Sequence, residues 1–212
     1  MSRGWHTGRA ALSARAAQVA IAAAGAVLML LASLHVLSPE FDPSWRVVSE
    51  YANGRYGWVL SLMFASWALS SWALAVTLWP QVKTIDGKIA LVFLIAAGVG
   101  EAMASVFDIN HPLHGLAGMI GVLSLPIAAM LISLSLVRTQ PWSRARNVIL
   151  WIANLTWGSL ALLVFLLMTG YLRAGNRVTR ESFAFIGWAN RLLIVAYCTW
   201  QMVIAGQPLR RR

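Results

Sequence analysis

Long apolar runs separated by short polar segments dominate the chain. A bilayer core of about 30 Å requires roughly 20 apolar residues in helical form. Six runs meet this requirement, and two of them are each interrupted by one charged residue, Glu101 within 89–107 and Arg191 within 182–209. The pattern therefore predicts transmembrane helices at about 16–38, 57–80, 88–108, 112–138, 147–172 and 183–206.

The expected fold class is an all-α membrane protein formed by a bundle of six transmembrane helices. Residues 16–209 make up one membrane domain, and 1–15 and 210–212 are short tails, which leaves no room for a soluble domain. The first run is longer than the 7–15 apolar residues of a cleaved signal peptide, so we expect it to be retained as a helix.

The segment after the first helix, 40–55, predicts a short interfacial helix in the first outer loop. Asp42 followed by Pro43 is typical of a helix start, and Gly54 can end the helix. Between them, apolar and aromatic residues recur at helical spacing, namely Trp45, Val48 and Tyr51.

The composition supports a membrane protein over other classes. Hydrophobic residues make up 59% of the 212 positions and charged residues 11%, whereas a soluble domain carries about a quarter charged residues. The net charge of +10 comes from scattered cations that flank apolar runs, so a nucleic-acid partner is not expected. Cys198 is the one cysteine, which excludes a disulfide framework.

The distribution of cations predicts the orientation, because cytoplasmic loops carry an excess of Lys and Arg. With a cytoplasmic N-terminus, the outer loops hold five cations and the cytoplasmic side holds eleven: Arg3, Arg9, Arg15, Lys83, Lys88, Arg138, Arg144, Arg146, Arg210, Arg211 and Arg212. We therefore expect a multi-pass protein of the bacterial inner membrane with both termini in the cytoplasm.

The third helix carries Glu101, Ser105 and Asp108, whose spacing places them on one face near the outer end. A carboxylate inside a span faces protein or water and indicates function, unless it forms a buried ion pair. Counted from the outer helix ends, Glu101 and Arg191 both lie roughly 10–14 Å deep, so we expect them to pair.

The turn between helices three and four combines ligand-type residues in the pattern Asp-x-x-His-x-x-His. Asp108, His111 and His114 suit a divalent metal with an open position for water, although short turns also use these residues as caps. His35, near the outer end of the first helix, can join the same cluster or bond to a loop.

Glu50 in the first loop has two interpretations. It can pair with Arg46, four residues earlier, or Ser49 and Glu50 can point over a cavity. The second interpretation predicts an outward-facing polar pocket formed by His35, Ser49, Glu50, Glu101, Ser105, Asp108, His111, His114 and Arg191.

Three segments, 37–52, 100–108 and 111–118, resemble an uncharacterised bacterial and archaeal membrane family, domain of unknown function 998. They read LSPEFDPSWRVVSEYA, GEAMASVFD and HPLHGLAG. The resemblance implies six membrane helices and no established reaction. More remotely, the order of loop, third helix and fourth helix is similar to the Frag1/DRAM/Sfk1 group, which would imply a lipid-linked or regulatory role.

The sequence is compatible with three functions. Membrane lipids are the expected partners of the protein. The favoured one is a non-enzymatic protein that binds a lipid or small ligand in the outer pocket. The second is a metal-assisted membrane hydrolase that uses the 108–114 ligands with Glu50 or Glu101 as general base. The third is an ion- or proton-coupled transporter that uses Glu101, disfavoured because the inner half of the bundle lacks ionisable residues.

Overall fold

The computed structural model describes residues 2–140, 142–174 and 181–209, without the side chains of 2–10. Within these ranges the chain is helical and contains no strand. Its elements are α1 (Ser2–Leu37), η1 (Val48–Asn53), α2 (Gly57–Leu78), α3 (Ile85–Val106), α4 (His114–Val137), η2 (Trp142–Ala145), α5 (Arg146–Ala174) and α6 (Ile186–Leu209). The six α-helices are long and apolar enough to cross a membrane, which confirms the expected fold class.

Four helices begin two or more residues away from the starts that the apolar runs predict. α3 begins at Ile85, after its cap Thr84, rather than at residue 88. The first helix extends back to Ser2, although its apolar, membrane-length part is Ala11–Leu37. α4 begins at His114 because the preceding residues form a hydrogen-bonded turn, and α6 begins at Ile186. The predicted tail 210–212 and the loop cations Arg177 and Arg180 lie outside the described residues.

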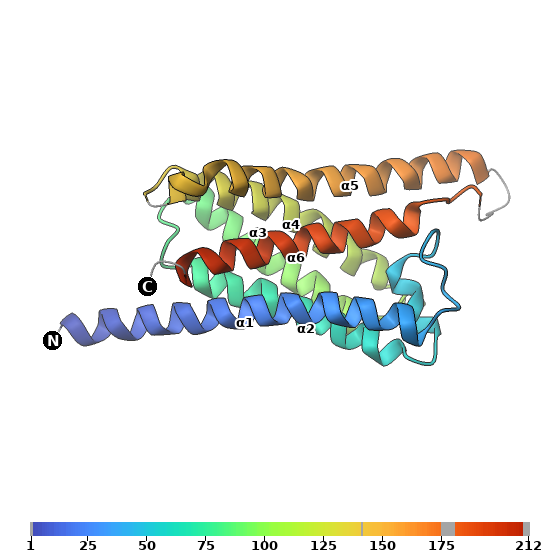
Figure 1. The fold of residues 1–212 in the computed structure, drawn as a ribbon, viewed down its shortest axis with the longest axis horizontal. Helices are drawn as coiled ribbons and strands as arrows, with labels where there is room; N and C mark the ends of the chain where they lie inside the picture. Colours follow the sequence, from blue (N-terminus) through green and yellow to red (C-terminus); the bar gives the residue numbers. More distant parts are fainter. Residues whose placement is uncertain (1, 141, 175–180, 210–212) are drawn as a thin grey trace.

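The helices form a ring in which each one packs against its neighbours in the sequence, and α6 closes the ring against α1 (Figure 1). We call the end that holds Ser2 and Leu209 the termini end, and the opposite end, with η1 and the α3–α4 turn, the loop end (Figure 1). This arrangement places α3 between α2 and α4, whereas α6 lies between α1 and α5.

The first loop is less helical than its sequence predicts. Asp42 caps a single turn, because its Oδ1 accepts hydrogen bonds from the backbone N–H and the hydroxyl of Ser44. Val47 is then extended, and the helix that follows is the short 3-10 helix η1, which Gly54 ends by donating to the carbonyl of Tyr51. The loop therefore contains a short helix, as predicted, but it is a 3-10 helix and begins at Val48.

Small residues let α3 and α4 approach closely. A Cβ atom added to Gly100 would collide with the backbone N of Gly121 and would lie 2.7 Å from the carbonyl oxygen of Ala117. The small residues around Glu101 thus bring the backbones of two helices into contact, as expected for membrane helices.

Pro126 lies inside α4 and leaves a carbonyl without its usual donor. Because proline has no N–H, the carbonyl of Val122 cannot accept the helical hydrogen bond from position 126. The hydroxyl of Tyr197 on α6 donates to this carbonyl at 2.8 Å. The proline of one helix is therefore compensated by a side chain of another, as the bilayer interior requires.

Candidate functional site

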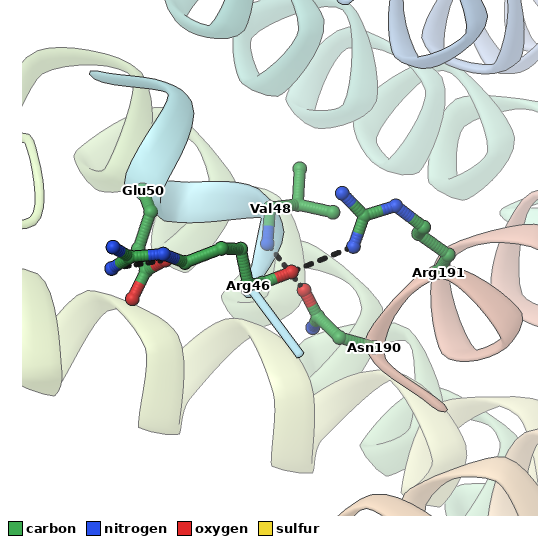
Figure 2. Close-up of polar contacts among 5 residues, drawn as sticks. All are labelled: Arg46, Val48, Glu50, Asn190 and Arg191. Atoms are coloured by element: carbon green, nitrogen blue, oxygen red, sulfur yellow. Dashed lines mark hydrogen bonds and ion pairs between the residues drawn. The ribbon is translucent and has the colours of Figure 1, made fainter. Parts of the chain in front are cut away.

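A buried arginine fastens the first loop to the bundle at the loop end. The guanidinium of Arg191 donates from Nη1 to the carbonyls of Arg46 (2.8 Å) and Gly187 (2.9 Å), and from Nη2 to the hydroxyl of Tyr51 (3.0 Å). Its Nε donates to Nε2 of His35 at 2.7 Å. Figure 2 shows the guanidinium of Arg191 directed at the main-chain carbonyl of Arg46 rather than at the carboxylate of Glu50.

These contacts fix the tautomer of His35. Because arginine can only donate, Nε2 of His35 must accept, and the ring hydrogen lies on Nδ1. Nδ1 in turn donates to the carbonyl of Leu31 at 2.7 Å. Asn190, next to Arg191, accepts the backbone N–H of Val48 at 2.8 Å (Figure 2). This cluster positions η1, and its polar groups bond to one another.

The predicted pair between Glu101 and Arg191 is wrong for the described part of the chain. The carboxylate of Glu101 accepts a hydrogen bond from the Ser71 hydroxyl at 2.7 Å, and Arg191 has the partners given above. The cause is the helix arrangement, because α3 packs against α2 and α4, whereas α6 packs mainly against α1 and α5. Glu101 shares a cavity with Tyr197, which lies about 9 Å below Arg191 on α6 at 1.5 Å per residue.

The cavity beside Glu101 has a volume of about 40 Å³ and lies between α2, α3, α4 and α6. Apart from Glu101 its wall is apolar or aromatic, with Phe64, Trp67 and Tyr197 as the large side chains. The Trp67 ring stacks on Phe64, with ring centroids 6.4 Å apart, and meets Tyr197 edge to face at 6.1 Å. A cavity of this size has room for about three water-sized groups.

Two buried polar groups of this wall differ in how they are satisfied. Glu101 is 5% exposed, and within the described residues its carboxylate receives the one hydrogen bond from Ser71. Trp67 is also 5% exposed, and its indole N–H has no hydrogen-bond partner among the residues that the structure describes. Buried polar groups are normally paired, so the wall offers a carboxylate and a donor that the chain does not fully satisfy.

Hydrogen bonds extend from Glu101 into the core. The Ser71 hydroxyl accepts the side-chain N–H of Gln201 at 2.8 Å, and Oε1 of Gln201 lies 3.0 Å from the Ser70 hydroxyl, which also lies 2.9 Å from the carbonyl of Ala20. The serine that holds Glu101 is thereby fixed by the last helix, and the chain of contacts links α1, α2, α3 and α6. Ser71 therefore fixes the carboxylate of Glu101 on the side of α2, while Glu101 also lines the cavity.

The residues of the predicted metal site serve the backbone of their own turn. Asp108 Oδ1 accepts from the N–H of Asn110, and Nδ1 of His111 accepts from the N–H of Leu113. Nδ1 of His114 lies 2.8 Å from the carbonyl of Phe107. Among the described residues, no group of three or more His, Cys, Asp or Glu side chains is arranged to hold a metal ion. The capping interpretation of Asp108, His111 and His114 therefore replaces the metal interpretation.

The remaining residues of the predicted pocket also lie apart from the cavity. Glu50 pairs with Arg46 at 3.3 Å (Figure 2), the alternative that its i, i+4 spacing had offered. Ser105 donates to the carbonyl of Ala102 in its own helix. Ser49 is half-buried in η1. Of the predicted pocket residues, Glu101 lines the cavity, while His35 and Arg191 support the loop above it.

Sequence reasoning did not identify four residues that shape this site, namely Trp67, Ser71, Tyr197 and Gln201. A signal was present for Gln201, because an amide in the middle of an apolar run needs a partner inside the bundle. Ser71 carries no such signal, since a serine can satisfy its hydroxyl on its own helix. Aromatic residues in a span give no indication of whether they face lipid or a cavity.

Comparison with protein families identifies the chain. The sequence model of the family described as "Protein of unknown function (DUF998)" matches residues 20–207. The chain therefore belongs to this family, as the resemblance of three shorter segments indicated. The comparisons do not show the remote similarity to the Frag1/DRAM/Sfk1 group. No curated protein and no solved structure matches the chain.

Proposed function

We propose that this member of the DUF998 membrane family binds a small ligand, or the headgroup of a membrane lipid, in the cavity beside Glu101. The observation that carries the proposal is a buried carboxylate on the wall of a cavity with aromatic side chains. A charged group within a span is costly unless it meets a partner, so its presence beside open space favours a ligand that supplies one. The hydrogen bonds from Ser71 and Gln201 favour a fixed binding geometry.

Binding, rather than catalysis, is the role that the geometry supports. The hydrolase hypothesis needed a metal held by Asp108, His111 and His114, but these side chains bond to backbone groups of their turn. The hydroxyl that bonds to Glu101, that of Ser71, does not line the cavity, so a ligand there would not meet it. Glu101 alone provides a charge, which suits recognition.

We propose that the protein lies in the bacterial inner membrane, and the cation distribution supports cytoplasmic termini with the loop end outside. The cavity then lies in the outer half of the bilayer, because Glu101 is near the loop end of α3 and Ala117 and Gly118 are near the start of α4. Phe64 and Val122 on the wall are half-buried, which supports a cavity with one side close to the lipid.

The proposal is tested by identifying what copurifies with the protein. The full chain is extracted in mild detergent and analysed by native mass spectrometry and lipid analysis, beside Glu101→Gln. Asp86→Asn is the matched control, since it removes the same charge at the other end of α3, where Asp86 forms an exposed pair with Arg138. We expect a bound species in wild type and control that falls at least fivefold in Glu101→Gln. Equal occupancy in all three proteins, or no bound species in any, would contradict the proposal.

A further inference from the structure

We infer that the ligand of the cavity carries an organic ammonium group, which lies against the aromatic rings and pairs with the carboxylate of Glu101. The inference rests on the proposed function and names the chemical class that this site recognises. It depends on the combination of one carboxylate with three aromatic side chains around a cavity of about 40 Å³.

The aromatic side chains form a continuous surface. Trp67 lies between Phe64, on which it stacks, and Tyr197, whose ring it meets at an interplanar angle of 67°. The faces of such rings carry partial negative charge and attract ammonium groups, and aromatic cages of this kind bind substituted ammonium ions. Tyr197 is held in position by its hydrogen bond to Val122, so its ring is a fixed part of the wall.

Glu101 supplies the formal counter-charge. Its carboxylate is 5% exposed and accepts one hydrogen bond among the described residues, from Ser71. An ammonium group can donate hydrogen bonds to this carboxylate and neutralise its charge where water is scarce.

The wall does not suit an inorganic cation. Na⁺, Mg²⁺ and Ca²⁺ need several oxygen ligands at short distances, and this wall offers one carboxylate among apolar and aromatic side chains. An anionic ligand would meet the charge of Glu101, with no cation on the wall to offset it. A group of about three non-hydrogen atoms fits the volume, which is the size of ethylammonium.

The test measures thermal unfolding of the full chain in detergent with ethylammonium chloride, sodium chloride at equal ionic strength, and ethanol as the uncharged analogue. We expect ethylammonium to raise Tm in a saturable manner in wild type and in the control Asp86→Asn. Glu101→Gln should need at least tenfold more ethylammonium for half the effect. Sodium chloride and ethanol should give no saturable shift.

A second variant keeps the test informative if Glu101→Gln does not fold. Ala104 lies one turn from Glu101 on the same wall, and Ala104→Val fills part of the cavity while keeping the carboxylate. Protection by ethylammonium should be lost in Ala104→Val, and retention at wild-type strength would overturn the inference.

Nanodiscs distinguish a lipid headgroup from a free amine. If the ammonium belongs to a lipid, phosphatidylethanolamine discs should protect wild type more than phosphatidylglycerol discs, and free ethylammonium should compete. If it belongs to a free amine, the two discs should be equivalent and ethylammonium should protect in both.

The inference and the proposed function fail in different ways. Equal, Glu101-dependent protection by ethanol and ethylammonium would show binding without charge recognition, which overturns the ammonium inference and leaves the proposed function standing. If no additive protects and no species copurifies, the proposed function fails as well.

Discussion

The Nε hydrogen of Arg191 points at Nε2 of His35, 2.7 Å away, and joins the last transmembrane helix to the first at the loop end. The side chain of Arg191 is 4% exposed, and its described partners are an imidazole, a phenol and two main-chain carbonyls. The buried cation is thus stabilised by dipoles rather than by a carboxylate.

Arg191 and His35 should be energetically coupled. Arg191→Leu should lower the free energy of unfolding by about 3 kcal/mol or more, because each buried acceptor that loses its donor costs about 1–3 kcal/mol. In a double-mutant cycle, Arg191→Leu and His35→Ala should show a coupling energy of about 0.5–3 kcal/mol. Reversible unfolding in mixed micelles measures it, and Arg191→Leu with Glu101→Gln is the reference pair, whose effects should add. Additivity between Arg191 and His35 would refute the contact.

The close contact between α3 and α4 should tolerate no side chain at position 100. Gly100→Ala should destabilise the protein by about 1–3 kcal/mol, because its Cβ would meet the backbone of Gly121 and Ala117. Gly115→Ala is the control, since no heavy atom lies within 4 Å of an added Cβ there. Thermal melts of the two variants should differ clearly, and a Gly100→Ala protein as stable as Gly115→Ala would contradict the packing.

Tyr197 and Pro126 should compensate each other. Tyr197→Phe leaves the carbonyl of Val122 without a donor and should cost about 1–3 kcal/mol. Pro126→Ala restores a backbone N–H that can bond to Val122, so the same Tyr197→Phe change should cost less in that background. Unfolding of the four proteins in the cycle gives the comparison. An equal cost in both backgrounds would show that Tyr197 does not act through this carbonyl.

Both termini should lie in the cytoplasm. The prediction follows from the excess of cations at the termini end and from the even number of membrane-length helices in the described chain. A reporter that is active only outside the cytoplasm should be silent when fused after Arg212 and active when inserted beside Asn110. The reverse pattern of activity would invert the topology and place the cavity in the inner half of the bilayer.

Hydropathy alone predicts which segments cross the membrane, because burial in lipid constrains each helix separately. Which helices lie side by side is a pairwise property, and matched depths along two helices do not establish it. Glu101 and Arg191 illustrate the difference, since their depths had predicted a pair and their actual partners are Ser71 and His35. The sequence predicted that His35 joins the 108–114 cluster or bonds to a loop, but its ring bonds to Arg191 and Leu31, and Arg191 could not be identified as its donor before α6 was placed beside α1.

The turn residues illustrate a second limit. Asp108, His111 and His114 have the side chains and the spacing of metal ligands, yet unpaired backbone groups occur in every tight turn and compete for the same side chains. The backbone groups of the turn lie next to these side chains, and all three side chains bond to them. A pattern of ligand types in a turn therefore favours a metal only when the backbone of the turn is satisfied in another way.

The partners of the two buried ionisable side chains have a bearing on how the protein enters the membrane during synthesis. Ser71 on α2 precedes Glu101 on α3, and His35, Arg46 and Tyr51 all precede Arg191 on α6. Glu101 and Arg191 therefore reach the bilayer after the residues that hydrogen-bond to them have been synthesised. The order of helices along the chain lets insertion proceed from the N-terminus without leaving either side chain to wait for a later segment.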